Sequence, residues 1–296
     1  MINKKDLSRR EFVSRATTIA GSFYLGLPWT DVKGDTKKSR VILIRDEKIL
    51  DHLLRPDSSR LEKMLDTAVS ELLDENDHRK AWGQLIQSED IVGIKTNQWN
   101  RLATPPALEA ILKNKVLQCG VKEKNISIDD RGIRSNSVFQ RSTALINVRP
   151  MRTHAWSGLG SLIKNYIMFV DSPSAYHGDS CADLATIWKL PVTKGKTRLN
   201  ILVMLTPLFH GIGPHHYNPE YVWPYNGLIV GIDPVAVDAT GMRIIQAKRE
   251  EFFKEIRPIN PPPKHILVAE TRHQLGVADA GKIDLVRLGW EKDSLI

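Results

Sequence analysis

Cysteine is scarce in this chain of 296 residues. Only Cys119 and Cys181 occur, and no C-x-x-C pair is present. Iron–sulfur clusters and cysteine-based zinc sites need several thiolates at characteristic spacings, so we expect no cysteine-ligated iron–sulfur cluster. A single disulfide between the two cysteines stays open, provided that the protein is exported to an oxidising compartment.

Long apolar runs are also lacking, because no stretch of 18 uninterrupted apolar residues occurs. We therefore expect no stable membrane span. The formal net charge of +8 is unevenly spread. Residues 1–40 hold nine Lys/Arg and four Asp/Glu, whereas the remainder holds 33 and 30. A body so close to balance lacks the basic surface of a nucleic-acid binder, so we expect no nucleic acid as partner.

The N-terminus carries a recognisable export pattern. Ser8-Arg9-Arg10-Glu11-Phe12-Val13 matches the twin-arginine motif, and a mildly apolar run from Ala16 to Leu27 follows it. We interpret residues 1–40 as a twin-arginine signal with a polar linker, the alternative being a basic amphipathic helix. This interpretation predicts the twin-arginine export machinery as a partner and a periplasmic or extracytoplasmic location.

The body, residues 41–296, alternates apolar runs with helical patterns, which predicts a single α/β domain with a mostly parallel or mixed sheet flanked by helices. Strands are expected at 40–45, 90–95, 125–129, 144–148, 200–205, 228–232, 265–269 and 283–288. Helices are expected at 58–73, 78–86, 106–120 and 234–249, and a further helix from the small residues near Gly158 through Lys164.

Polar side chains follow four of these predicted strands. In open α/β sheets ligands gather beyond the carboxyl ends of the strands, so these residues outline a candidate site. They are Lys95 and Asn97, the pair Asp130-Arg131, the group Arg149, Arg152 and His154, and Asp233.

Several motifs in the same order resemble the family known as domain of unknown function 362. They are IVGIKTN (91–97), Asp130-Arg131, LINVRPMRTHAWSGLGSLIKN (145–165), PSAYHGDSCADLATI (173–187), PLFHGIGP (207–214) and LIVGIDPVAVDATG (228–241). The resemblance extends over residues 41–288 and supports the α/β expectation, but the family name implies no activity.

The segment from His154 to Lys164 is more distantly similar to the nickel-pincer lactate racemases. That resemblance implies an acid–base role for His154, a cofactor-holding role for Lys164 and metal ligation by His177, thirteen residues further on. The chain offers no clear partner for the second catalytic histidine of those racemases, so a two-base racemase mechanism does not carry over.

The candidate site follows from both arguments. We expect His154 and Lys164 to be catalytic, His177 and His210 to be metal ligands, and five residues to bind a substrate or cofactor: Lys95, Asn97, Arg131, Arg152 and Asp233. Structural alternatives remain for several of them. Asp233 can cap the helix that Pro234 begins, Asp130 and Arg131 can pair internally, and Asp238 can form a structural salt bridge.

These residues predict an exported enzyme that acts on a small anionic substrate with a bound metal or phosphorylated cofactor. The alternative is a non-catalytic solute- or cofactor-binding protein of the cell envelope that uses the same cleft. A redox or maturation accessory is a third reading, which the missing cysteine motifs weaken.

Overall fold

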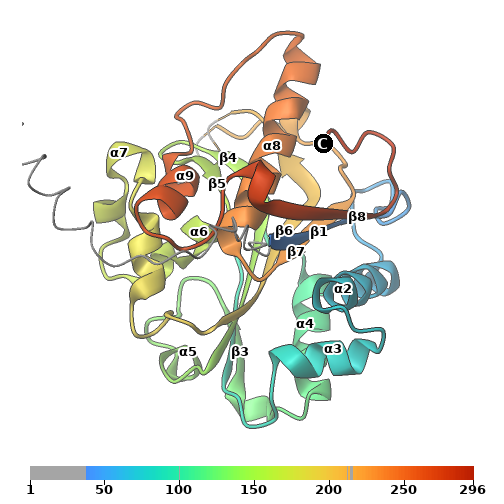
Figure 1. The fold of residues 1–296 in the computed structure, drawn as a ribbon, viewed down its shortest axis with the longest axis vertical. Coiled ribbons are helices and arrows are strands. Elements are labelled where there is room, and N and C mark those ends of the chain that lie inside the picture. Colours follow the sequence, from blue (N-terminus) through green and yellow to red (C-terminus); the bar gives the residue numbers. More distant parts are fainter. Residues whose placement is uncertain (1–37, 100, 212, 214–215) are drawn as a thin grey trace, which may run out of the picture. The chain divides into compact units, whose positions relative to one another are not determined.

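One mixed sheet of eight strands organises the computed structural model (Figure 1), which describes residues 38–99, 101–211, 213 and 216–296. The twin-arginine motif and its apolar run lie outside these residues. The strands are β1 Ser39–Arg45, β2 Val92–Lys95, β3 Ile126–Asp129, β4 Ala144–His154, β5 Gly158–Gly160, β6 Thr197–Leu208, β7 Gly227–Gly231 and β8 Ile283–Gly289. Their order across the sheet is β3-β2-β4-β6-β7-β1-β8, with β5 paired to β4.

Strand direction determines which loops share an edge of the sheet. Strands β3, β2, β4 and β6 are mutually parallel, so their carboxyl ends meet at one edge. Strand β7 is antiparallel to both β6 and β1, and β8 is parallel to β1. The loop that follows β7 therefore emerges at the opposite edge from the loops that follow β2, β3 and β4.

Helices cover both faces of the sheet (Figure 1). Helices α2 Ser58–Leu73, α3 His78–Leu85 and α4 Pro106–Gln118 pack on one face with side chains such as Ile42 and Ile44 of β1. Helices α6 Leu162–Asn165, α8 Pro234–Phe253 and α9 Lys264–Thr271 pack on the other face with Val41 and Leu43. The alternation of β1 side chains between two cores is what the period of two along a strand requires.

The remaining elements are short. Helices α5 Ser137–Gln140 and α7 Gly178–Cys181 have four residues each. The 3₁₀ helices are Glu123–Asn125, Tyr166–Phe169, Pro173–Tyr176, Leu184–Lys189, Pro219–Tyr221 and Ala280–Lys282. Among the described residues no helix combines the length and apolar character needed to cross a membrane.

The predicted fold class is confirmed: helices flank a mixed α/β sheet in a compact unit of residues 38–296. The sequence left a disulfide between Cys119 and Cys181 open, and in the structure both cysteines are free. The segment predicted as a strand at 265–269 is wrong, since it lies in helix α9. Its apolar run resembles a strand, but His265, Ile266 and Ala269 are buried at helical spacing while Leu267 is 60% exposed.

The segment around Gly158 also differs from the prediction. Strand β4 continues to His154, so that histidine ends a strand instead of lying in a loop. Gly158–Gly160 forms β5, which turns back on β4, and helix α6 begins only at Leu162. Gly158 adopts φ +70°, and a Cβ there would lie 2.1 Å from the carbonyl oxygen of Pro261. Only glycine fits at that close approach.

Candidate functional site

A cavity of about 380 Å³ opens at the shared carboxyl edge of β2, β3 and β4. The β4–β5 turn, helix α6 and the 3₁₀ helix at Pro173–Tyr176 complete its wall. Its lining is Asn97, Trp99, Asp130, Arg131, Arg149, Arg152, His154, Trp156, Lys164, Asn165, Ile167, Met168, Pro173 and His177. The cavity lies at the edge of the sheet where the strand-exit argument expects a ligand site.

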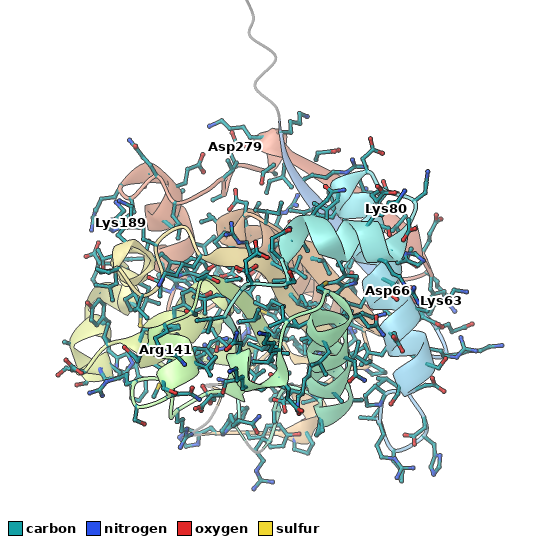
Figure 2. The ribbon with its side chains drawn as sticks, turned by 90° about the horizontal axis from the view of Figure 1, so that it is seen from below. Lys63, Asp66, Lys80, Arg141, Lys189 and Asp279 are labelled. Atoms are coloured by element: carbon teal, nitrogen blue, oxygen red, sulfur yellow. The ribbon has the colours of Figure 1, made fainter. Side chains whose placement is uncertain are left out.

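Three buried cations distinguish this cavity from an ordinary polar cleft. Arg149, Arg152 and Lys164 are 4%, 2% and 3% exposed. Most charged side chains lie at the surface instead, as Lys63, Lys80 and Lys189 do at the periphery of Figure 2. Within the described part of the chain, none of the three forms a salt bridge. A buried charge without a counter-charge is costly, so these three side chains create a strong preference for an anion.

The two arginines are held differently. Arg152 donates from Nη2 to Oδ1 of Asn97 at 2.8 Å, and its guanidinium lies 4.7 Å from the ring centre of Trp99. Arg149 forms no side-chain hydrogen bond to any described residue, and its buried Nε has no partner. Burial lowers the pKa of Arg149 to about 10, with Asp130 and Asp238 opposing that effect. Both arginines remain charged near neutral pH, and Arg149 keeps its donors for a ligand.

Lys164 is the third cation. Its Nζ lies 3.5 Å from Sγ of Cys181, the partner that the structure gives it. Burial lowers the pKa of Lys164 to about 8; Cys181 opposes this change, whereas Arg149 and Arg152 add to it. Burial also raises the pKa of the Cys181 thiol, which therefore stays neutral. Lys164 consequently exchanges its proton close to physiological pH, unlike a surface lysine.

His154 ends β4 beside these cations. Burial first, and then Lys164, Arg149, Arg152 and His177, hold the pKa of His154 far below its usual range. The imidazole is therefore neutral at neutral pH. Its Nδ1 accepts from the backbone N–H of Trp156 at 3.3 Å, which assigns the ring proton to Nε2. Gly213 lies close to this end of β4, because a Cβ there would be 2.5 Å from the carbonyl oxygen of Thr153.

The indole of Trp156 connects two of the predicted histidines. It stacks on His177 with ring centres 4.3 Å apart and lies 5.6 Å from the ring of His154. His177 is half-buried, and burial together with Lys164 lowers its pKa. Neutral imidazole and indole surfaces thus form one wall of the cavity, and the cations lie deeper.

Lys95 and Asp130 form a buried ion pair next to the cavity. Lys95 is fully buried and donates from Nζ to Oδ1 of Asp130 at 2.5 Å and to the carbonyl oxygen of Thr96 at 2.7 Å. Oδ2 of Asp130 accepts from the backbone N–H of Gln98. Burial lowers the pKa of Lys95 to about 8, although Asp130 opposes that change. Burial alone would raise the pKa of Asp130, but Lys95 and the hydrogen bonds lower it overall.

This pair gives Lys95 a role other than the predicted one. Lys95 does not line the cavity, and its ammonium joins the ends of β2 and β3. Asp130 pairs with Lys95 and not with Arg131, which is exposed at the rim of the cavity. Asp130 favours the charged forms of Arg149 and Arg152, but its ion-pair partner is Lys95, so none of the three cavity cations has a salt bridge to it.

Helix α6 is fixed by two residues whose importance the sequence did not reveal. Asp238 of α8 accepts from Oγ of Ser161 at 2.7 Å and from the backbone N–H groups of Leu162 and Ile163 at 2.9 Å each. Nδ2 of Asn165 donates to the carbonyl oxygens of Lys95 and Val148. Asp238 therefore caps α6 in place of the predicted salt bridge, and together these contacts place Lys164 against the cavity.

Two predicted site residues lie elsewhere. Asp233 follows β7 at the opposite edge of the sheet, where it caps α8 and accepts from Oγ of Ser39 and the N–H of Val277. His210 packs on Tyr221 and Phe253, and its Nδ1 lies 2.9 Å from Nη1 of Arg249. The strand-exit rule misplaced Asp233 because β7 is antiparallel.

Of the other predicted residues, six line the cavity and one lies behind it. Asn97, Arg131, Arg152, His154, Lys164 and His177 all line the cavity. Lys95 lies directly behind it. Arg149, Asp130 and Trp99 also line it, and of these Arg149 was recognisable only as one of several polar residues near the end of a strand.

Comparison with known proteins gives a match to part of the chain. Residues 105–243 match the family model described as Domain of unknown function (DUF362). The matched segment contains Asp130, Arg149, Arg152, His154 and Lys164, and it leaves out Lys95 and Asn97. It is shorter than the 41–288 range over which the motifs resemble that family. No curated protein and no solved structure matches the chain.

Proposed function

We propose that this protein binds a small, multiply charged anion in the cavity, and that His154 and Lys164 serve that anion as acid–base groups. One observation supports the proposal most strongly: three buried cations line one cavity without salt-bridge partners among the described residues. An anion of carboxylate, sulfate or phosphate type would supply the missing counter-charge, and a bidentate oxyanion suits the planar guanidinium of Arg149.

Binding can be tested directly by calorimetric titration of the full chain with sulfate and with inorganic phosphate. The substitution Arg149→Met should weaken binding about tenfold or more, because it removes charge-assisted hydrogen bonds of about 1.5–3 kcal/mol. The matched control is Arg141→Met, since Arg141 is exposed just after α5 and does not line the cavity. Equal affinity in both variants would contradict an anion site in this cavity.

An enzyme and a binding protein differ in what His154 does. A bound anion would offset the charges of Lys164, Arg149 and Arg152, which help to lower the pKa of His154. The imidazole can then remove a proton from a carbon next to a carboxylate, and the neighbouring cations would stabilise the charge that develops. Proton–deuterium exchange of small carboxylates in D₂O, followed by NMR, would reveal this reaction. His154→Gln should abolish exchange and leave sulfate binding intact. If exchange survives in this variant, His154 is not catalytic; if the unchanged chain binds sulfate and shows no exchange, the non-catalytic binding protein is favoured.

A resident metal has weaker support. In residues 38–99, 101–211, 213 and 216–296, no group of three or more His, Cys, Asp or Glu side chains could hold a metal ion. His177 lines the cavity and is able to give one ligand, whereas His210 lies outside it. The residues therefore fit a metal only if an anionic cofactor supplies most ligands, with the cations holding that cofactor. Elemental analysis of protein purified from its native host would test this variant of the proposal.

Export is proposed on the Ser8–Val13 motif alone. Replacement of both Arg9 and Arg10 by lysine should keep the protein in the cytoplasm, which cell fractionation would show. Unchanged export would remove the twin-arginine machinery as a partner.

A further inference from the structure

Two buried lysines in this fold have similar proton affinities and different surroundings. The pKa values of Lys95 and Lys164 are both lowered to about 8, mainly by burial. Lys95 is bonded to a carboxylate and to a backbone carbonyl, and it does not reach the cavity. Lys164 lines the cavity and contacts a thiol. Of the two, only Lys164 has an amine that a ligand can reach.

The surroundings of Lys164 favour a neutral, nucleophilic amine. Desolvation and neighbouring cations are the two features that convert a lysine into a nucleophile toward carbonyl carbons. Both are present, because Lys164 is 3% exposed and the guanidinium groups of Arg149 and Arg152 lower its proton affinity. With a pKa of about 8, about a quarter of the molecules carry the neutral amine near pH 7.5, against about one in a thousand for an ordinary lysine.

The same cavity contains a group suited to hold a carboxylate. The guanidinium of Arg149 forms no side-chain hydrogen bond to the described residues, and its planar fork matches a carboxylate in geometry. Arg149 and Lys164 both line this cavity, so one small ligand can contact both side chains. A ligand with a carboxylate next to a carbonyl would therefore place its carboxylate on Arg149 and present its carbonyl carbon to Lys164.

We propose that Lys164 condenses with the carbonyl group of a 2-oxo carboxylate to form an imine, with Arg149 holding the carboxylate. This proposal deepens the proposed function and rests on the anion site. The neutral Nζ attacks the carbonyl carbon, giving a carbinolamine. The two amine protons and the carbonyl oxygen then leave as water, and the C=N bond forms. His154, neutral at the edge of the cavity, can carry a proton from the nitrogen to the departing oxygen. The step needs neither an oxidant nor a reductant.

The imine can be trapped by reduction. The full chain is incubated with pyruvate and sodium cyanoborohydride, and the modified residue is located by intact mass and peptide mapping. We expect one adduct per chain, on Lys164, and suppression of that adduct by excess sulfate. The variant Lys164→Arg keeps the positive charge and removes the nucleophile, so labelling should fall to the level of surface lysines. The variant Lys113→Arg should label as the unchanged chain does, because Lys113 pairs with Glu123 at the surface.

The outcomes separate the imine proposal from the proposed anion site on which it rests. If sulfate binds and pyruvate gives no adduct on Lys164, the imine is refuted while the anion site stands. The same conclusion follows if the adduct formed by the unchanged chain persists in Lys164→Arg. If sulfate does not bind and does not suppress labelling, the anion site itself fails. Scattered labelling of several lysines would also refute the imine, because it would show ordinary surface chemistry.

Discussion

The pH dependence of anion binding follows from the buried Lys164. The perturbation is a rise in pH from about 7 to about 9.5 with sulfate as the ligand, because sulfate stays a dianion over this range. Lys164 loses its proton near pH 8 in the free protein. A bound dianion favours the ammonium form, so binding takes up a proton above that pH. Affinity should therefore fall as the pH rises through about 8.

Two limits bound how much the affinity for sulfate can change with pH. One proton taken up on binding weakens affinity at most tenfold for each pH unit. If sulfate restores the ordinary pKa of 10.5, the difference from about 8 corresponds to about 3.4 kcal/mol in total, at 1.36 kcal/mol for each pKa unit. Up to pH about 9 the other cavity groups change little, and only above that does Arg149 begin to lose its proton. Arg149 has a pKa of about 10, and the lowered pKa values of His154 and His177 leave both imidazoles neutral.

Calorimetry in buffers of different ionisation enthalpy measures both the affinity and the proton uptake. Lys164→Met should bind sulfate more weakly at pH about 7 and should lose the pH dependence above about 8. Lys113→Met is the matched control, because Lys113 is partly exposed, pairs with Glu123 at the surface and should leave the profile unchanged. A pH dependence that survives Lys164→Met, or a flat profile in the unchanged chain, would refute the assignment of this proton to Lys164.

Two further predictions concern the scaffold of the site. Asp130→Asn should lower the free energy of unfolding by about 3–5 kcal/mol in urea titrations, because Lys95 would stay buried without its partner. Glu123→Gln, which breaks an exposed pair, should change it little, and equal effects would contradict the role given to burial. Gly158→Ala should lower the melting temperature, since its φ and the nearby Pro261 oxygen exclude a Cβ. Gly83→Ala in α3 has open space and should stabilise by up to about 1 kcal/mol; the same sign for both glycines would disprove the reasoning.

Most of the fold could be predicted from local patterns. The helix at Ser58–Leu73 was predictable because Asp57 caps its N-terminus and its apolar residues recur at helical spacing. The helix at Lys264–Thr271 was missed because its run of aliphatic residues is equally compatible with a strand. Tertiary packing decides such cases: His265, Ile266 and Ala269 face the core together with α8.

The candidate site was predictable in position and less so in membership. Residues after parallel strands do converge, which is why Asn97, Arg152 and His154 share one cavity. Strand direction cannot be read from a single strand, so Asp233 was assigned to the wrong edge. Asn165 was not singled out, and Asp238 was interpreted as part of a salt bridge, because both hold helix α6 through contacts between distant parts of the chain.

No local sequence pattern predicts which charged side chains form ion pairs in the fold. Lys95 and Lys164 both occur in short motifs among apolar and small residues, and both are buried in the fold. Long-range contacts give Lys95 the carboxylate of Asp130, whereas Lys164 faces the cavity with Arg149 and Arg152 as neighbours. A paired lysine stabilises the scaffold, and an unpaired one lowers stability unless a ligand compensates for it. The fold therefore keeps Lys164 at an energetic cost, which is understandable if the cavity binds an anion.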